Sequence, residues 1–161
     1  MQLTFPGPDA PAPPVVSFAM PEGWHPIVTP GSVLSAAKQV EADVFTANAM
    51  VTWVRESSEF LLEEAVRLLE VELRAQPDCS MLEPIEAGFD GLHGVGRGAV
   101  FTQPGVGALA QFHVMLLAPG HGYSDLVHMT VTIGGDRVAE DFPEVRDLLH
   151  SIRVNVAVGT S

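Results

Sequence analysis

Two histidines could bring a pair of imidazoles onto one surface of a β-sheet. His113 and His128 lie in two consecutive segments that alternate apolar and polar residues. If Ala118 pairs with Tyr123 across the intervening Pro-Gly-His-Gly loop, His113 lies directly opposite His128. Two imidazoles placed in this way could contact one transition-metal ion, but the pattern fixes no third ligand beside them. We therefore interpret them as hydrogen-bonded or exposed residues of a binding surface, with a pH-sensitive patch or a metal site as alternatives.

Three glycines form a second candidate binding site. Gly94, Gly96 and Gly98 recur with the period of a β-strand, so their missing side chains leave a shallow trench on one face. Either bulky neighbours such as Trp53 or the closing helix fill this trench, or it receives an apolar ligand or an extended peptide. Arg97 points to the other face and is interpreted as an ordinary surface residue. The run is no nucleotide-binding loop, because the third glycine of that motif, its strand-to-helix context and a following lysine are missing.

No residue pattern indicates catalysis. Ser124 lies near His121 and Asp125 in the sequence, but adjacency within a hairpin does not create the geometry of a catalytic triad. Cys79 follows an aspartate rather than a cation, which does not favour a reactive thiolate. We predict no catalytic residue, no bound metal and no cofactor.

Charge and composition exclude several classes of partner. The chain has 161 residues and a net charge of −12, which would repel nucleic acid and anionic membrane surfaces. Cys79 is the only cysteine, so no intrachain disulfide can form, which fits a reducing cytosol. No apolar run is long enough to span a bilayer. We expect a cytoplasmic protein for the chain as printed, and an exported one if a leader precedes it.

The sequence divides into an arm, one domain and a tail. Residues 1–14 contain a proline-rich stretch, which predicts an extended or disordered arm; its alternative role is that of a ligand for a proline-binding groove. Residues 15–154 are long enough for a single domain, and residues 155–161 form a C-terminal tail.

The sequence predicts seven strands and one ambiguous segment. Period-two patterns and glycine or proline boundaries predict strands near 16–18, 24–28, 47–54, 81–86, 92–101, 108–117 and 124–133. Residues 31–40 fit either a strand or a short helix. The assumed Ala118–Tyr123 pairing also places Val127 opposite Val114 and Met129 opposite Phe112, so that one face is apolar. On the other face it opposes Thr130 to Gln111.

Two helical segments complete the domain. Apolar residues with helical spacing follow Ser58, and Pro77 ends that helix. A closing helix is predicted to begin at Asp141, which would cap it together with Glu144. These elements predict an α+β domain in which an antiparallel sheet carries two main amphipathic helices.

Several motifs resemble one known family. They are the turn Phe18–Trp24, the strand 47–52, the acidic helix after it, the strands 112–115 and 127–132, and the closing helix with Ser151 and Ile152. In this arrangement the chain resembles the actinobacterial LpqN/LpqT group, which has a Mog1/PsbP-like fold. Trp24 is then expected to anchor the core rather than to stack on a ligand.

The resemblance implies a binding role. Proteins with this fold serve as binding or accessory subunits without a shared catalytic motif, and LpqN/LpqT members are typically exported lipoproteins, whereas this sequence lacks their signal peptide and lipid-attachment cysteine. We therefore expect a non-enzymatic module that engages a protein or peptide through its sheet face or edge, where it could also form a homodimer. The alternatives are a small-molecule or lipid carrier with a pocket between sheet and helices, and a metal-assisted enzyme at His113 and His128.

Overall fold

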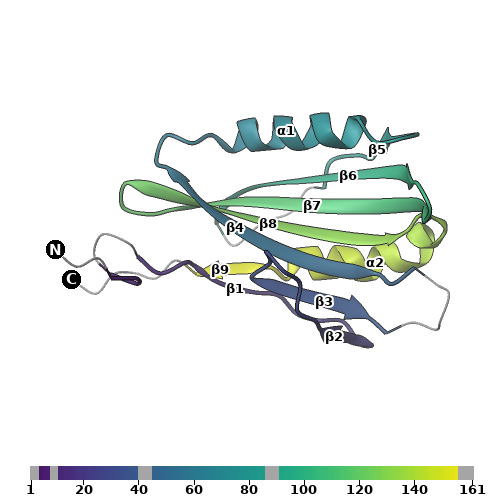
Figure 1. Ribbon diagram of the computed structural model, residues 1–161, viewed down its shortest axis with the longest axis horizontal. Helices are drawn as coiled ribbons and strands as arrows, with labels where there is room; N and C mark the ends of the chain where they lie inside the picture. The colour runs from purple at the N-terminus through teal and green to yellow at the C-terminus, as the bar shows by residue number, and fades with distance from the viewer. Residues whose placement is uncertain (1–3, 8–10, 40–44, 86–90, 156–161) are drawn as a thin grey trace.

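The main feature of the fold is one antiparallel sheet. The computed structural model describes residues 4–7, 11–39, 45–85 and 91–155. Seven strands lie in the order β2-β3-β4-β8-β7-β6-β5 (Figure 1). Their bounds are β2 Trp24–Pro26, β3 Leu34–Lys38, β4 Asn48–Ser57, β5 Ser80–Met81, β6 His93–Gln103, β7 Gly107–Pro119 and β8 Tyr123–Gly134. The segment 31–40, which was ambiguous in the sequence, therefore contributes strand β3.

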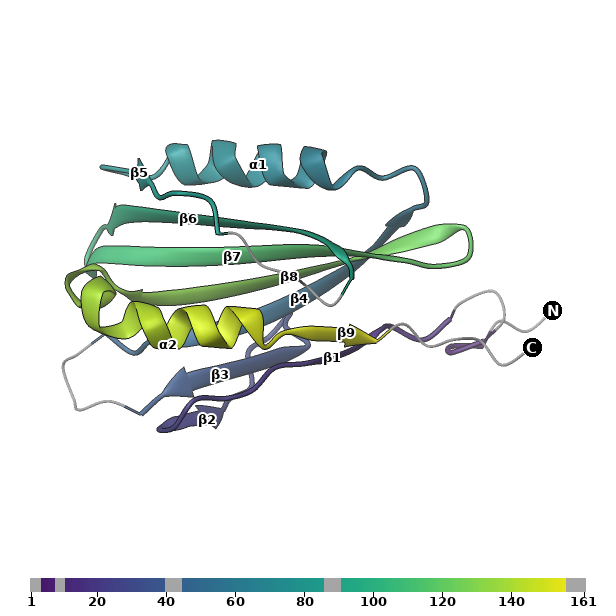
Figure 2. The ribbon, with the colours of Figure 1, turned by 180° about the vertical axis from the view of Figure 1, so that it is seen from behind.

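A separate two-stranded ribbon joins the two ends of the domain. β1 (Val15–Ser17) pairs with β9 (Arg153–Asn155) and not with the large sheet. β9 directly follows the closing helix, so the ribbon continues the line of that helix (Figure 2). The turn after β1 then leads the chain to Trp24 in β2.

Two helices cover opposite faces of the sheet. Helix α1 (Leu62–Arg74) buries one stripe against β5, β6 and β7, and this stripe consists of Leu62, Ala65, Val66, Leu69 and Leu73. Helix α2 (Val138–His150) follows the short 3₁₀ helix η1 (Gly135–Arg137) and packs on the other face. Each fully buried aliphatic side chain contributes about 1.5–3 kcal/mol to folding. The observed architecture is thus the predicted α+β domain, with the helices on separate faces.

Alternation along the strands divides the core in two. On β8 the odd-numbered residues from Val127 to Ile133 join the α2-side core, and the even-numbered residues face the α1 side. Helix α1 spans only the β5–β7 part of its face, so parts of β4 and β8 are not beneath a helix there. No helix among the described residues is long and apolar enough to cross a membrane.

The predicted pairing of β7 with β8 is wrong by two residues. His113 lies opposite Thr130, His128 opposite Met115, and Val114 opposite Met129. The reason is the turn: the Gly120 amide donates to the Tyr123 carbonyl at 2.9 Å, so the turn is shorter than the loop we assumed. Pro119 pairs with Ser124 next to that bond, at a position where no amide donor is required. A shift of two residues keeps every side chain on its predicted face.

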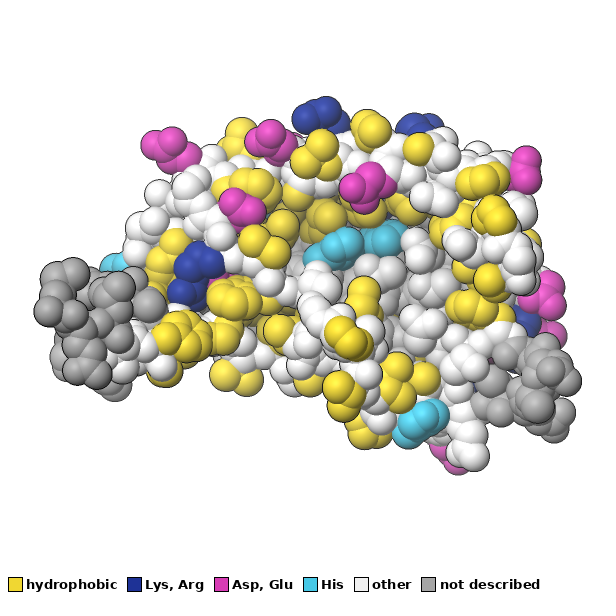
Figure 3. Space-filling view, viewed as in Figure 1, with side chains coloured by type: hydrophobic (Ala, Val, Ile, Leu, Met, Phe, Trp, Pro, Cys, Tyr) yellow, Lys and Arg dark blue, Asp and Glu magenta, His cyan; other side chains and the backbone are white. Residues whose placement is uncertain are grey.

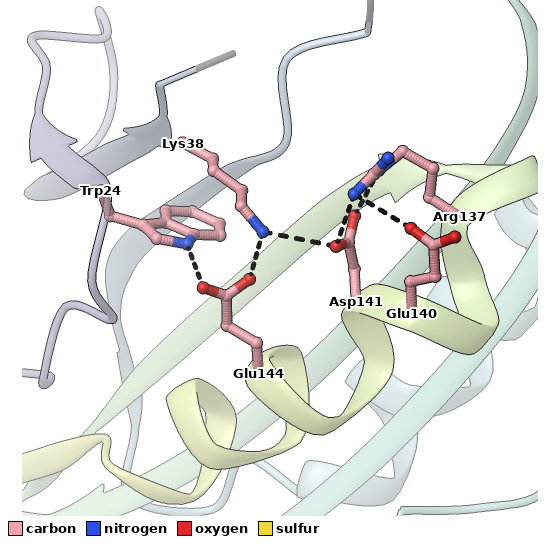
Figure 4. Close-up of polar contacts among 6 residues, drawn as sticks. All are labelled: Trp24, Lys38, Arg137, Glu140, Asp141 and Glu144. Atoms are coloured by element: carbon pink, nitrogen blue, oxygen red, sulfur yellow. Dashed lines mark hydrogen bonds and ion pairs between the residues drawn. The ribbon is translucent and has the colours of Figure 1, made fainter.

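The predicted cap of the closing helix is also wrong. Helix α2 begins at Val138, so Asp141 lies inside its first turns and not before them. Asp141 instead accepts hydrogen bonds from Arg137 at 3.0 Å and from Lys38 of β3 at 3.3 Å (Figure 4). Burial raises the pKa of Asp141, but the hydrogen bonds from Arg137 and Lys38 outweigh that effect and lower the pKa below its ordinary value of 3.8.

Trp24 is a core anchor, as predicted. Its residue exposure is 8%, and its indole Nε1 donates to Glu144 Oε1 at 3.1 Å. Glu144 also binds Lys38 Nζ at 2.6 Å through its second oxygen, so one carboxylate of α2 holds both β2 and β3 (Figure 4). This network fastens one edge of the sheet to the helix.

Candidate binding site around His113 and His128

The structure places His113 and His128 side by side on the α1-side face. They are diagonal neighbours and not directly opposed, because Thr130 occupies the position across from His113. Diagonal positions on a sheet are within reach of aromatic side chains. His113 Nδ1 lies 3.0 Å from His128 Nε2, and the two ring centroids are 5.2 Å apart. The two histidines are therefore neighbours, as predicted, although they do not pair directly across the strands.

Thr130 completes a three-residue polar cluster. Its Oγ1 lies 3.2 Å from His113 Nδ1 and 3.4 Å from His128 Nε2. A neutral imidazole has one donor and one acceptor nitrogen, so one ring donates to the other and the hydroxyl adjusts to either tautomer. The cluster fixes the orientation of both rings.

Burial keeps both imidazoles uncharged. Burial, with a smaller contribution from the neighbouring His128, lowers the pKa of His113 from 6.5 to about 3. Burial also lowers the pKa of His128 to about 4. The two rings are consequently neutral near pH 7, and they offer hydrogen-bond donors and acceptors rather than charge.

One atom of the cluster has no hydrogen bond. His113 Nε2 is buried, and it contacts no donor or acceptor among the described residues. An unpaired buried polar atom typically costs about 1–3 kcal/mol. Arg97 lies opposite His113 on β6, but its guanidinium binds Glu70 of α1 at 2.6 Å. That ion pair confirms that Arg97 points away from the glycine trench.

The cluster lies in the floor of an open part of the sheet. Strand β4 borders it with Met50, Thr52 and Val54, whose side chains share the face of Thr130 because strand residues alternate. The space-filling view shows histidine side chains together in the middle of this face, in a hollow below α1 (Figure 3). We call Met50, Thr52, Val54, His128 and Thr130 the open face.

The chemistry of the cluster is that of a hydrogen-bonding surface. Among the described residues, no group of three or more histidine, cysteine, aspartate or glutamate side chains is positioned to hold a metal ion. The inward nitrogens of the pair already share one hydrogen bond. The arrangement can accept or donate single hydrogen bonds to a ligand that rests on the open face.

The three glycines lie on the opposite face and are not part of this site. A Cβ atom at Gly96 would stand 2.6 Å from Ile85 Cβ, and one at Gly98 would stand 3.2 Å from Leu82 Cδ1. Leu82 and Ile85 therefore fill the trench at these two positions, where we had suggested Trp53 or the closing helix. Gly94 lies two residues before Gly96 and pairs with Leu116.

An apolar groove adjoins the filled trench. It has a volume of about 240 Å³ and is lined by Leu82, Glu83, Ile85, Phe112, Val138 and Phe142. Phe112 and Phe142 contact each other in it with ring centroids 5.3 Å apart. Period-two glycines in β6 indicate that something packs there, and the closing helix, one of the expected neighbours, contributes Val138 and Phe142 to the groove. No local signal identifies the segment after β5.

Sequence reasoning missed a second polar site, at Arg55. The guanidinium forms a two-point ion pair with Asp125, at 2.9 Å and 3.2 Å, and Asp125 is 1% exposed. Arg55 lies in a charge-rich stretch of the sequence, and nothing near it indicates that its partner is a residue of β8. Only the β4–β8 pairing reveals the contact.

Comparison with known proteins supports the fold at the level of structure. No protein-family model and no curated protein matches the sequence. Among solved structures, LpqN of Mycobacterium tuberculosis, involved in cell envelope biogenesis, matches with a TM-score of 0.74 at 10% identity, over 92% of this chain and 88% of LpqN.

Two further structures extend the comparison. Cyanobacterial PsbP from Synechocystis sp. PCC 6803 matches with a TM-score of 0.54 at 14% identity, over 92% of this chain and 96% of that chain. The Ran-binding protein Mog1p of Saccharomyces cerevisiae matches with a TM-score of 0.52 at 9% identity, over 86% and 89% of the two chains. At these identities the likeness concerns the fold alone. The chain has an LpqN-like, Mog1/PsbP-like fold.

Proposed function

We propose that this protein is a non-catalytic binding or accessory module that engages a protein or peptide through its open face. The observation that carries the proposal is the neutral polar cluster at the part of the α1-side face that α1 leaves uncovered, along β4 and β8. His113, His128 and Thr130 are held in fixed orientations by one another. A rigid set of uncharged donors and acceptors suits recognition of backbone or side-chain polar groups.

The same geometry argues against acid–base catalysis by these histidines. A general acid or base works best when its pKa lies near the operating pH. Burial moves the pKa values of His113 and His128 to about 3 and about 4, so at neutral pH neither ring is an imidazolium that could act as a general acid, and both are weak bases. Binding needs no such proton transfer.

The edges of the large sheet offer little backbone to a partner. The outer strands β2 and β5 are 3 and 2 residues long, and β2 contains Pro26, which has no amide donor. A homodimer through an edge strand would have few backbone hydrogen bonds available at these strands. We therefore assign the partner to the open face.

A pair of matched substitutions tests the proposal. Val54 on the open face is 50% exposed, and Val71 on the outer side of α1 is 58% exposed. Wild-type protein, Val54→Arg and Val71→Arg would each be used to capture and chemically cross-link partners from the native host. We expect Val54→Arg to lose a partner that wild type and Val71→Arg retain, with cross-links mapping near β4 and β8.

Two results would contradict this assignment. Equal partner lists for the two arginine variants would remove the open face as the interface. Cross-links confined to α2 or to the β1–β9 ribbon would place the interface elsewhere. Circular dichroism of each variant checks that the fold is kept.

The apolar groove supports a second candidate, a small-molecule or lipid carrier. Its lining is almost wholly apolar, but 240 Å³ is less than the roughly 300 Å³ that usually marks a ligand pocket. Titration with an apolar fluorescent probe would decide: saturable binding that Phe142→Ala weakens and Val71→Ala leaves unchanged favours the carrier. Either candidate could act in the cytoplasm or after export.

A further inference from the structure

Arg55 holds the proline-rich arm of the chain against the sheet. Its Nη1 donates to the Pro11 carbonyl at 2.7 Å, and its Nη2 donates to the Ala12 carbonyl at 3.1 Å. The other side of the guanidinium binds Asp125, which is almost fully buried. The side chain therefore bridges the sheet and the backbone of Pro11 and Ala12. Because strand residues alternate, Arg55 lies on the α2-side face, away from the open face.

Two aromatic side chains flank the guanidinium. Arg55 Cζ lies 4.1 Å from the ring centroid of Tyr123 and 5.3 Å from that of Trp53. These distances are typical of cation–π contacts, which fix the plane of the guanidinium. Trp53 Nε1 is buried and has no hydrogen-bond partner among the described residues, so the site keeps one unused donor.

These features together match the chemistry of proline recognition. Grooves for proline-rich segments use aromatic walls and donors that bind the exposed carbonyls of an extended backbone. Residues 11–14 read Pro-Ala-Pro-Pro, form no helix or strand, and have φ fixed by proline at three of four positions. The arm thus has the restricted backbone and the carbonyl acceptors that such a groove selects.

We infer that Trp53, Arg55, Tyr123 and Asp125 form a recognition site for extended proline-rich segments, which the chain's own arm occupies and from which a partner's segment can displace it. Binding the arm costs little entropy because it is tethered, so the arm competes with every external segment. The net charge of −12 disfavours a second copy of the chain and favours a proline-rich partner that carries lysine or arginine.

The test measures binding of a defined peptide to the full chain. The probe is a fluorescein-labelled Pro-Ala-Pro-Pro-Val-Val peptide with two lysines at its C-terminus, and its control has alanine at each proline. The protein is used as wild type and as a full-length variant with Pro11→Gly, Pro13→Gly and Pro14→Gly, which makes the arm a weaker competitor. Fluorescence anisotropy reports binding.

We expect the glycine variant to bind the probe at least tenfold more tightly than wild type does. Adding Arg55→Lys to the glycine variant should weaken binding at least tenfold, because lysine keeps a charge beside Asp125 but cannot bridge two carbonyls as well. The matched control is Arg97→Lys. The side chains of Arg97 and Arg55 are 25% and 24% exposed, and Arg97 is ion-paired on the opposite face.

A second readout does not depend on any substitution of the site itself. Nuclear magnetic resonance of the ¹⁵N-labelled glycine variant separates the indole signals of Trp53 and Trp24. Addition of the probe should shift the Trp53 signal and leave that of Trp24, which is bound to Glu144, in place. This comparison stands even if Arg55→Lys lowers the folding stability.

Four outcomes would overturn the inference. The first is that the anisotropy does not change when the glycine variant meets up to millimolar probe, and the second is that the alanine peptide binds as tightly as the probe. The third is that Arg55→Lys and Arg97→Lys weaken binding equally, and the fourth is that the probe does not shift the Trp53 indole signal. Wild type that sediments as a dimer while the glycine variant is a monomer would show exchange of arms between copies, and would overturn the assignment to a separate partner.

Discussion

At the scale of single residues, His113 and His128 make the folding stability depend on pH. In the unfolded chain each ring titrates near 6.5, whereas burial lowers the folded pKa values to about 3 and about 4. Below pH 6.5 the unfolded state therefore binds more protons than the folded state does. Stability is complete above that pH and is lost progressively as the pH falls toward the folded pKa values.

The resulting prediction is a loss of stability on mild acidification. By about pH 5 each histidine should reduce the free energy of unfolding by about 2 kcal/mol, measured by urea denaturation. The double variant His113→Gln, His128→Gln should show a flatter profile between pH 7 and pH 5. His93→Gln, which removes a histidine whose side chain is 60% exposed, serves as control. An identical slope in the double variant and in wild type would refute the buried neutral pair.

Two glycines of β6 differ in the room that surrounds them. Gly96→Ala would place a Cβ atom 2.6 Å from Ile85 Cβ and 2.7 Å from the Ile85 carbonyl oxygen, so backbone must move. We expect a loss of about 1–3 kcal/mol in the free energy of unfolding. At Gly98 the nearest atoms are Leu82 Cδ1 and Phe112 Cδ1 at 3.2 Å, so these two side chains need to move by only a few tenths of an ångström. Gly98→Ala should therefore be nearly neutral in the same denaturation experiment, and equal losses would mean that the segment after β5 does not pack as described.

At the scale of elements, a few ionic contacts join α2 to the edge of the sheet. Lys38 of β3 binds Glu144 at 2.6 Å and Asp141 at 3.3 Å, with the lysine side chain 24% exposed. The hydrogen bond with Glu144 is the largest cause of the raised pKa of Lys38. Lys38→Ala should lower the stability by about 1 kcal/mol.

An exposed ion pair on α2 provides the comparison. Arg146 contacts Asp147 at 3.4 Å, and both side chains are more than half exposed. Arg146→Ala should leave the melting temperature unchanged, because solvent screens such a pair. Thermal melts of Lys38→Ala and Arg146→Ala at low and high salt would distinguish the two contacts. Equal changes of melting temperature in both variants would show that the Lys38 contacts contribute no more than an ordinary surface pair.

The sequence predicts the elements better than it predicts their contacts. Strands β6 to β8 and helix α1 have long, regular patterns, and their positions follow from those patterns. The β7–β8 register does not, because a proline looks like a loop residue although Pro119 occupies a ladder position that needs no amide. The error was an even number of residues, so His113 and His128 still share a face.

Contacts between distant elements leave no local trace in the sequence. Strand β9 is 3 residues long and is stable only beside β1. The residues around Asp141 predict a helix cap, yet its carboxylate forms ion pairs with Lys38 and Arg137. The Arg55 site depends in the same way on Asp125, which the β4–β8 pairing brings opposite it.

At the scale of the whole molecule, β8 is the strand on which both cores depend. It pairs with β4 on one side and β7 on the other along nearly its full length. Its odd-numbered residues belong to the α2-side core, and Leu126 packs into the α1-side core. The outer parts of the molecule, β2, β5 and the β1–β9 ribbon, each have a single strand partner.

The contrast between β8, which is paired on both sides, and the outer strands, which have one partner each, predicts a graded pattern of amide hydrogen exchange. Amides of β8 near Met129 can exchange only when the sheet opens as a whole, whereas those of the β1–β9 ribbon need only local separation of short strands. Exchange followed by mass spectrometry should therefore be at least a hundredfold slower over 127–133 than over 15–17 at neutral pH. The β4 segment 48–51, which is paired with β3 on one side and β8 on the other, should follow β8. If the ribbon were protected as strongly as β8, it would unfold together with the sheet, and the ribbon and sheet would form a single cooperative unit.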